Sequence, residues 1–240
     1  MPEPAAGRVS ALVGMDLAAS GVVLNLCFHG IGAPRRVLEP DEERFWVKES
    51  QFDEMLDTVA DDPAVRISFD DANASDIATA LPHLSRRGLS ATFFVIAGRI
   101  GRPGSLSRGD LQELVAAGMT IGAHGMHHRP WRTATDRELH QEIDEAPRVI
   151  ADAAGTAVDR FACPHGSYDR RVLRALRHHG AARVYTVDGG AARADGWLQS
   201  RYVVERTDTA ESLAALGRNP HGTSMTRTLR SLKCAVKRLR

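Results

Sequence analysis

Cysteines, aromatic residues and long apolar runs are all scarce in this sequence of 240 residues. The three cysteines, Cys27, Cys163 and Cys234, are too few for a disulfide framework and fit a reducing compartment. Aromatic residues make up only 5% of the chain, so an extended binding cleft of aromatic rings is not expected. No stretch approaches the roughly 18 apolar residues that a membrane-spanning helix needs.

An excess of charge is also missing, because the net charge is +1, which gives no reason to expect a nucleic-acid partner. The charges are nevertheless unevenly distributed, since seven Lys or Arg and no acidic residue follow Glu211. Residues 1–20 lack the layout of a signal peptide, because Asp16 interrupts their apolar stretch, so we expect a cytoplasmic protein.

The end of the chain combines apolar and basic residues at helical spacing. The apolar positions are Leu229, Leu232, Val236 and Leu239, and the basic positions are Arg230, Lys233, Lys237 and Arg240. This pattern predicts either a weak peripheral contact with an anionic membrane surface or a C-terminal helix whose charges are simply solvated.

Strand-like apolar runs alternate with segments whose apolar residues recur at the helical period of 3.6. The predicted strands span residues 22–28, 65–69, 91–97, 119–123, 159–163, 183–187 and 201–204. Several are continuous β-branched or aromatic runs, as expected for parallel strands buried on both faces. Thr135 and Glu138 predict a capping box for a long helix, which Pro147 should kink or divide. The alternation predicts an α/β fold, either a βα barrel or a doubly wound sheet.

Two adjacent carboxylates, Asp70 and Asp71, follow the predicted strand 65–69 in the stretch ISFDDANASD. In both α/β architectures, the carboxyl ends of parallel strands carry the active site. The pair is therefore either a solvated strand end that caps the next helix or a reaction centre. In a reaction centre, one carboxylate would bind a metal and the other would transfer a proton.

Three histidines fall within five positions in GAHGMHHRPW, residues 122–131, after the predicted strand 119–123. His124 and His128 can point two imidazoles at one cation, and two imidazoles with one carboxylate suit Zn²⁺. Such a set leaves a position open for water, which is the pattern of a catalytic site. The alternative is a polar loop with chance histidines, and we expect His127 to be an exposed neighbour.

A third loop, in FACPHGSYD, follows the predicted strand 159–163. Pro164 stiffens it, and Gly166 permits the close approach of a ligand, so the backbone N–H of His165 can face a substrate oxygen. The alternative is a plain strand-to-helix turn in which Ser167 or Asp169 caps the next helix.

Together, these strand ends resemble the motifs of the polysaccharide deacetylase family, the NodB-homology domain of carbohydrate esterase family 4. SFDD is similar to its T-F-D-D motif, HGMHH to H-[S/T]-x-x-H, and ACPHG to R-x-P-[Y/F]-G. ATFFVIAG matches the strand that the family shows between the first two motifs. The resemblance divides the chain into an N-terminal extension (1–20), a deacetylase-like domain (21–206) and a basic C-terminal tail (207–240).

The resemblance implies a single-domain, deformed (β/α) barrel of about seven parallel strands with one divalent transition metal, most often Zn²⁺. Asp71, His124 and His128 would bind the metal, and Asp70 would be the general base. The implied reaction is hydrolysis of an acetamide, with the metal and the His165 backbone N–H holding the oxyanion. Its products are acetate and a free amine on a sugar.

Two family positions differ in this chain. Ala162 stands where the third motif has the Arg that positions the catalytic Asp, and LQSRYVVER (198–206) lacks the late histidine that supplies a general acid. Arg201 is the candidate replacement for the Arg, with a surface salt bridge as the alternative. His29 and His165 are the candidate acids, although His29 also fits a turn histidine bonded to the backbone.

The predicted function is a cytoplasmic, metal-dependent hydrolase that removes N-acetyl groups from an N-acetylated sugar, oligosaccharide or polysaccharide intermediate. A hydrolase of the same fold acting on a non-sugar amide and a non-catalytic, metal-retaining carbohydrate-binding protein are the alternatives. Pro164, Gly166 and Trp131 are the predicted substrate contacts. Trp131 would be a stacking platform for a sugar, and a position in the core is its alternative.

Overall fold

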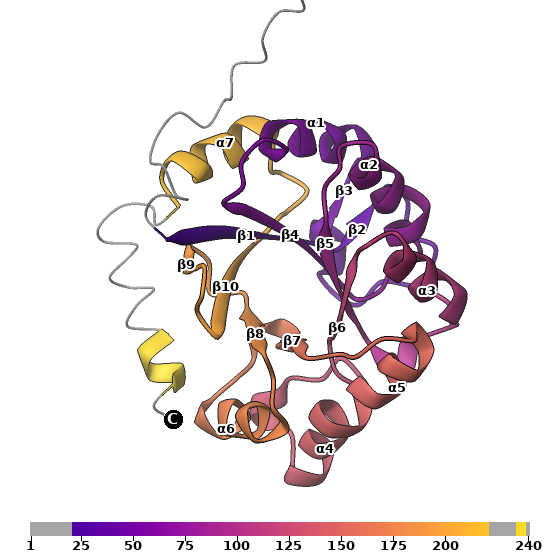
Figure 1. The fold of residues 1–240 in the computed structure, drawn as a ribbon, viewed down its shortest axis with the longest axis vertical. Coiled ribbons are helices and arrows are strands. Elements are labelled where there is room, and N and C mark those ends of the chain that lie inside the picture. Colours follow the sequence, from indigo (N-terminus) through magenta and orange to yellow (C-terminus); the bar gives the residue numbers. More distant parts are fainter. Residues whose placement is uncertain (1–20, 221–233, 239–240) are drawn as a thin grey trace, which may run out of the picture.

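The computed structural model describes residues 21–220 and 234–238. Within these ranges, seven parallel strands form a closed barrel with helices around its outside (Figure 1). The barrel strands are Val22–Phe28 (β1), Val65–Asp70 (β4), Ala91–Val95 (β5), Thr120–Ala123 (β6), Arg160–Ala162 (β7), Arg183–Thr186 (β8) and Leu198–Val203 (β10). They are hydrogen-bonded in this order, and β10 closes the barrel by pairing with β1, where Asn25 lies opposite Arg201. The predicted deformed barrel is therefore confirmed.

Short elements complete the described part of the fold. Gly30–Ile31 (β2) pairs with Trp46–Val47 (β3), and Ala192–Arg193 (β9) runs antiparallel to the start of β1. The α-helices are Glu49–Val59 (α1), Leu81–Ser85 (α2), Arg108–Ala116 (α3), Asp136–His140 (α4), Ala146–Ala154 (α5), Arg170–His179 (α6) and Ala210–Arg218 (α7). The π-helical turns are Asp76–Ala80 (η2) and Gln141–Glu145 (η5), and the 3-10 turns are Glu42–Phe45 (η1), Ala97–Arg99 (η3), Trp131–Thr133 (η4) and Pro164–Gly166 (η6).

The main hydrophobic core lies between the barrel and its helices. On β1 and β4, alternate residues point outward, as a strand's period of two requires. The Phe28 ring meets Phe52 of α1 edge-on, with centroids 5.2 Å apart, and Phe69 stacks on Phe93 at 4.7 Å. On these two strands, the residues that alternate with the outward-facing ones point into the barrel interior, and several of them are polar.

The last barrel strand begins earlier than predicted, at Leu198 instead of residue 201. Its stretch LQSR is not apolar, so the hydrophobic pattern missed it. The polar side chains are buried in pairs inside the barrel, where the Asn25 amide donates to Gln199 Oε1 at 3.1 Å. Hydrogen bonding of this kind removes most of the cost of burying an amide.

Local signals at helix ends are largely as predicted. The Thr135 hydroxyl accepts from the backbone N–H of Glu138, whose side chain accepts in return, so the capping box is confirmed. Asp169 caps α6 by accepting from the Val172 N–H at 2.9 Å. The interruption expected at Pro147 is the π-helical turn η5 directly before α5, because a proline cannot supply the N–H that a regular helix needs.

The predicted N-terminal extension and most of the predicted amphipathic stretch lie outside the described residues. Part of the predicted tail belongs to the barrel surface, since α7 packs against α1 and buries Leu213. Near the end of the chain, Lys237 Nζ lies 2.7 Å from an oxygen of Asp188. Across the described ranges, we find no helix long and apolar enough to cross a membrane.

Candidate metal and catalytic site

Seven of the predicted site residues meet in a cleft of about 600 Å³ at the carboxyl ends of the barrel strands. His29, Asp70, Asp71, His124, His128, His165 and Arg201 all line this cleft. They come from the carboxyl ends of β1 and β4, from the loops after β6 and β7, and from β10 itself. The closed parallel barrel is what brings them together, because all its strands end at the same rim.

Asp70, the last residue of β4, forms a buried ion pair with Arg201 of β10. The two carboxylate oxygens of Asp70 lie 2.7 Å from Nη1 and 2.7 Å from Nη2 of Arg201. Burial alone would raise the pKa of Asp70, but the Arg201 guanidinium outweighs it and lowers that pKa well below the usual range. Asp70 is therefore a fully ionised, rigidly held carboxylate.

Arg201 is itself held on every side. It donates to the Ser68 hydroxyl at 3.1 Å and to the Thr186 carbonyl at 3.4 Å, and the Phe94 ring centroid lies 5.1 Å from its guanidinium carbon. Its side chain has no exposed surface, which excludes the surface salt bridge considered above. The expected contact between Arg201 and Asp70 is thus present.

Asp71 has a different environment from its neighbour. Its φ of 78° and that of Ala72, 58°, place two successive non-glycine residues in the left-handed region, a strain found at functional sites. The buried Oδ1 of Asp71 has no hydrogen-bond partner among the described residues. It lies 3.7 Å from His124 Nε2 and 3.4 Å from His128 Nε2.

Both histidines use their other ring nitrogen to fix the ring. His124 Nδ1 lies 2.9 Å from the Ala162 carbonyl oxygen, and His128 Nδ1 lies 3.0 Å from a carboxylate oxygen of Glu39. A hydrogen bond of this kind orients an imidazole so that Nε2 can bind a metal. Burial lowers the pKa of His124 to about 4, so its imidazole is neutral at neutral pH, as a ligand must be.

Asp71, His124 and His128 therefore fit a divalent metal. Their candidate ligand atoms all lie within 4.8 Å of one another, and an unpartnered buried oxygen faces two imidazole nitrogens. One carboxylate and two imidazoles are a donor set that suits Zn²⁺.

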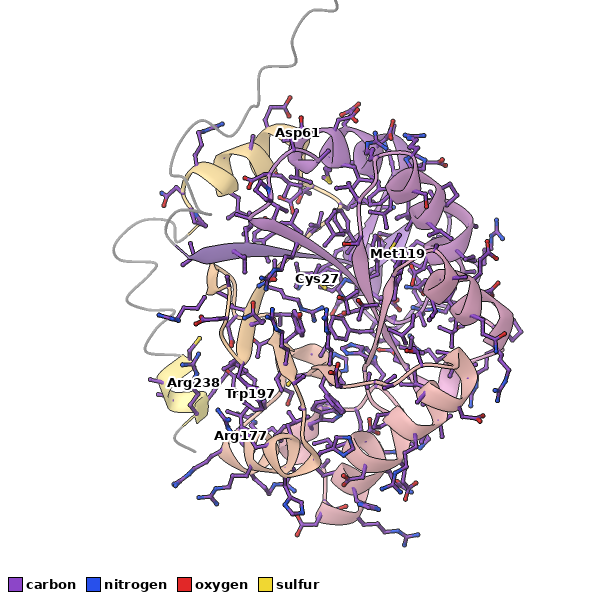
Figure 2. All side chains as sticks on the ribbon, in the orientation of Figure 1. Cys27, Asp61, Met119, Arg177, Trp197 and Arg238 are labelled. Carbon is purple, nitrogen blue, oxygen red and sulfur yellow. The ribbon has the colours of Figure 1, made fainter. Side chains whose placement is uncertain are left out.

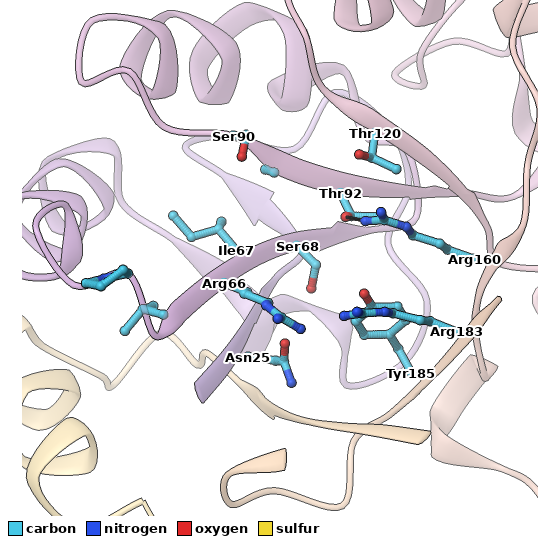
Figure 3. Close-up of a pocket in the computed structure, with 13 residues that line it drawn as sticks. Asn25, Arg66, Ile67, Ser68, Ser90, Thr92, Thr120, Arg160, Arg183 and Tyr185 are labelled. Carbon is cyan, nitrogen blue, oxygen red and sulfur yellow. Dashed lines mark hydrogen bonds between the residues drawn. The ribbon is translucent and has the colours of Figure 1, made fainter. Parts of the chain in front are cut away.

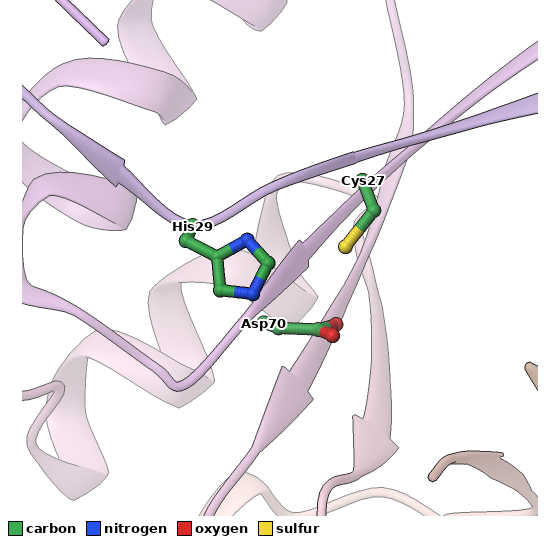
Figure 4. A group of neighbouring side chains, drawn as sticks. All are labelled: Cys27, His29 and Asp70. Atoms are coloured by element: carbon green, nitrogen blue, oxygen red, sulfur yellow. The ribbon is translucent and has the colours of Figure 1, made fainter. Parts of the chain in front are cut away.

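Two other groups next to this set have similar spacing but different chemistry. In the group of Cys27, His29 and Asp70 (Figure 4), Arg201 occupies both Asp70 oxygens, and burial raises the pKa of the Cys27 thiol. In the group of Glu39, His128 and His165, the Glu39 carboxylate already contacts His128 and Arg99. The set with Asp71 is the one whose atoms are free.

Two positioning carboxylates were not foreseen from the sequence. Glu142 has no exposed surface and accepts from the backbone N–H groups of Met126 at 2.8 Å and His127 at 3.1 Å, so it holds the histidine loop in place. Gly125, with a φ of 80°, lies so close that a Cβ there would be 2.1 Å from Glu142 Oε2. Glu39 orients His128 from 89 residues away, and no local pattern marks either carboxylate.

The two candidate acids occupy different positions. His29 stacks on Phe45 with ring centroids 4.9 Å apart, and Figure 4 shows its imidazole beside the Asp70 carboxylate. Its Nδ1 is buried and has no partner among the described residues, so the expected alternative of a turn histidine bonded to the backbone through that atom is not observed. His165 is exposed, and its Nε2 lies 3.0 Å from the His128 carbonyl oxygen.

Pro164 and Gly166 shape the loop after β7 and do not line the cleft themselves. Gly166 has a φ of 59°, and a Cβ there would lie 2.4 Å from Val187 Cγ2. His165, with a φ of 54°, continues the left-handed backbone, which projects its ring towards His128 at a centroid distance of 4.3 Å.

The expectation that Trp131 stacks on a sugar is wrong. Trp131 has no exposed surface, and its indole N–H donates to Glu142 at 3.3 Å, so it packs in the core behind the histidine loop. Trp46 is also buried, and Arg177 covers the Trp197 ring at 4.0 Å from its centroid (Figure 2).

Replacing Arg201 by leucine should destabilise the metal-free protein by about 3–5 kcal/mol, because it leaves the buried Asp70 carboxylate without a partner. Urea unfolding in the presence of a chelator measures this loss. Because Arg201 holds the folded pKa of Asp70 below the unfolded value of about 3.9, the pair stabilises the fold above that pH and less below it. The difference between the two proteins should therefore shrink as the pH falls.

The double variant with Asp70→Leu and Arg201→Leu is the control, and it should be more stable than Arg201→Leu alone, since no unpaired charge remains. Equal unfolding midpoints for the wild type and Arg201→Leu would show that the ion pair is not important for stability.

Comparison with known proteins agrees with the fold and the motifs. Residues 57–184, just over half of the chain, match the family model described as Polysaccharide deacetylase. YxkH of Bacillus subtilis, named as a polysaccharide deacetylase, is 25% identical over 150 residues, which are 62% of this chain and 53% of that protein. A chitooligosaccharide deacetylase of Bradyrhizobium is 30% identical over 124 residues, covering 51% of this chain and 55% of its own. This chain thus spans about half the length of these two relatives.

Solved structures show the same architecture. The deacetylase PplD of Streptococcus pyogenes, in complex with acetate, superposes with a TM-score of 0.70 at 21% identity, over 81% of this chain and 97% of that one. A likeness at this identity concerns the fold, whereas the family model also matches the sequence. The chain therefore belongs to the polysaccharide deacetylase family.

Proposed function

We propose that this protein is a metal-dependent hydrolase that removes N-acetyl groups from an N-acetylated sugar, oligosaccharide or polysaccharide intermediate. The observation that carries this proposal is the unequal environment of two adjacent carboxylates. Arg201 binds both oxygens of Asp70, whereas Asp71 points an unpartnered oxygen at two imidazoles. One carboxylate is arranged to handle a proton and the other to bind a cation.

Asp71, His124 and His128 would hold one divalent transition metal, and their donor set suits Zn²⁺. When bound, such a metal supplies a Lewis acid that polarises the acetamide carbonyl and makes water more acidic. Glu39 and the Ala162 carbonyl orient the imidazoles of His128 and His124, respectively, for metal binding.

Asp70 would act as the general base. Its carboxylate remains ionised through the pH range of the cell, because the Arg201 guanidinium lowers its pKa, and its oxygens are fixed at the rim of the cleft. A rigidly placed carboxylate can accept the proton of the attacking water without reorganising during the reaction. The backbone N–H of His165 would donate to the oxyanion that forms on the acetyl carbon.

His29 would supply the proton to the departing amine. Its ring is fixed against Phe45 and faces the cleft beside Asp70. His165 is the weaker candidate, because its Nε2 is hydrogen-bonded to a carbonyl oxygen, which only accepts, and that nitrogen therefore keeps its proton in the loop contact.

The retained base favours a hydrolase over the alternative of a non-catalytic, metal-retaining carbohydrate-binding protein. Ala162 removes the family's arginine from the third motif, yet Arg201 restores a bidentate partner for Asp70 from another strand. The volume of the cleft, about 600 Å³, lies in the range of small-molecule sites and suits a short sugar segment. Acetate release from a non-sugar amide, with none from N-acetylglucosamine oligomers, would instead support the alternative of a non-sugar substrate.

We also propose that the protein acts in the cytoplasm. All three cysteines are free thiols, and Cys27 and Cys163 are buried in the barrel. Three unpaired cysteines, two of them buried, support a reducing compartment.

His124→Ala should abolish stoichiometric metal binding, since it removes one of three ligands, whereas His127→Ala should bind one equivalent per chain like the wild type. His127 is exposed and lies one residue from His128, so it is a matched control for loss of an imidazole from the same loop. Metal analysis after dialysis measures both variants. One tightly held equivalent of zinc in His124→Ala would refute the ligand assignment.

Asp70→Asn should retain the metal but lose about 10²–10⁴-fold in the rate of acetate release, because an amide cannot accept the proton. Acetate release from N-acetylglucosamine oligomers with added Zn²⁺ is the assay. Asp57→Asn, which changes a carboxylate on the exposed face of α1, is the control and should keep full activity. Near-normal turnover of Asp70→Asn would remove Asp70 from its role as base.

His29→Ala should slow acetate release more than His165→Ala in the same assay, since the His29 imidazole lies beside Asp70 in the cleft. General-acid loss typically costs about 10²-fold or more in rate. A larger loss of rate in His165→Ala would instead identify His165, in the loop after β7, as the general acid.

A further inference from the structure

A second pocket, of about 430 Å³, opens at the amino-terminal ends of the barrel strands. Arg66 is the second residue of β4, and Arg160 and Arg183 are the first residues of β7 and β8. Asp70 lies four residues further along β4, roughly 13 Å at the rise of a strand, so this pocket lies at the opposite end of the barrel from the cleft.

Three arginines converge in this pocket (Figure 3). Arg160 and Arg183 are register partners on adjacent strands, and Arg66 reaches towards them from β4, on another side of the barrel. Thr92 and Thr120 lie at the same level, and their hydroxyls add polar groups to the lining. Placing three like charges at one depth of a barrel is unfavourable unless a negative charge accompanies them.

The lining of the pocket contains neither Asp nor Glu. Within the described ranges, none of the three guanidinium groups forms an ion pair with a carboxylate. Arg66 Nη2 donates to the Ala194 carbonyl at 3.2 Å, and Arg160 Nη1 lies 3.5 Å from the Thr92 hydroxyl. Arg66 Nη1 is buried and has no partner among the described residues.

The electrostatics of Arg66 agree with this geometry. Burial lowers the pKa of Arg66, and the positive charges of Arg183 and Arg160 lower it further. Asp62 accepts from the Ala64 N–H at 2.9 Å, and Asp195 binds Arg193 at 3.0 Å while the more distant charge of Arg183 also lowers the Asp195 pKa. Each guanidinium carries five N–H donors, so most of the donors in this pocket are free for a ligand.

We propose that this pocket binds a phosphate group, held by Arg66, Arg160 and Arg183 with hydroxyl donors from the strands. Guanidinium groups match the oxygens of a phosphate in pairs, and a group with nearly two negative charges offsets the three positive ones better than a single carboxylate does. The pocket is larger than a phosphate ion, so it also has room for the organic part of a phosphate ester. This proposal does not depend on deacetylase activity at the other rim.

Phosphate binding is tested on the full chain, kept metal-free with a chelator so that an oxyanion cannot bind at a metal. Thermal unfolding and titration calorimetry compare potassium phosphate, glycerol phosphate and potassium chloride at equal ionic strength. We expect both phosphates, and not chloride, to raise the melting temperature, because a ligand of the folded state stabilises it. Tighter binding of glycerol phosphate assigns the pocket to an ester, and tighter binding of inorganic phosphate assigns it to the free ion.

Arg66→Gln and Arg183→Gln should each weaken phosphate binding by about tenfold or more, because each removes a charge-assisted hydrogen-bonding group. Without phosphate, Arg183→Gln should raise the melting temperature, since it relieves repulsion in the pocket. Arg170→Gln, at an exposed position of α6, is the matched control and should change neither quantity.

Equal effects of phosphate and chloride on the wild type would overturn the proposal. So would unchanged phosphate affinity in Arg183→Gln, which remains the deciding variant if Arg66→Gln does not fold. The Arg183 guanidinium donates no hydrogen bond to the described residues, so its replacement leaves no side-chain partner unpaired.

Discussion

The buried ion pair between Arg201 and Asp70 is the interaction on which the site depends. Both side chains are almost completely buried, so each charge is tolerated because the other is held against it in a bidentate geometry. The pair forms only in a closed barrel. Strand β1 pairs with β10 on one side and with β4 on the other, so closure places Arg201 of β10 next to Asp70 of β4. Closure thus contributes directly to the chemistry: it keeps one carboxylate ionised, and the neighbouring carboxylate remains free to face two imidazoles.

The polar interior of the barrel supplies side chains both to the cleft at the carboxyl ends of the strands and to the arginine pocket at their amino ends. On β4 the inward-facing residues are Arg66, Ser68 and Asp70, and the apolar residues between them pack against the helices. Ser68 connects the arginine pocket with the cleft, because it lines the pocket and its hydroxyl accepts a hydrogen bond from Arg201. The same alternation that places acids at the carboxyl rim places arginines at the amino rim, where they form no ion pair with a carboxylate of the described residues.

Residues next to apolar strand runs could be predicted from the sequence, because parallel strands deliver their carboxyl ends to a common rim. The family resemblance anticipated Arg201 as a replacement for the missing arginine, whereas the strand-end argument placed Asp70, Asp71, His124 and His128 in one cleft. It failed for Trp131, because proximity in sequence does not determine whether an aromatic ring points to the cleft or to the core. The roles of Glu39 and of the three arginines could not be predicted in this way. The contact of Glu39 with His128 and the convergence of the arginines depend on long-range folding, which no local sequence pattern records.

The central claim is that the two neighbouring carboxylates have separate tasks, a cation for Asp71 and a proton for Asp70. Anomalous diffraction from crystals soaked in zinc, recorded on both sides of the zinc absorption edge, tests it most directly. The account predicts one peak bounded by Asp71, His124 and His128, with Asp70 still bonded to Arg201 through both oxygens. A peak bound to Asp70 with Arg201 displaced, or no peak in the cleft, would contradict it.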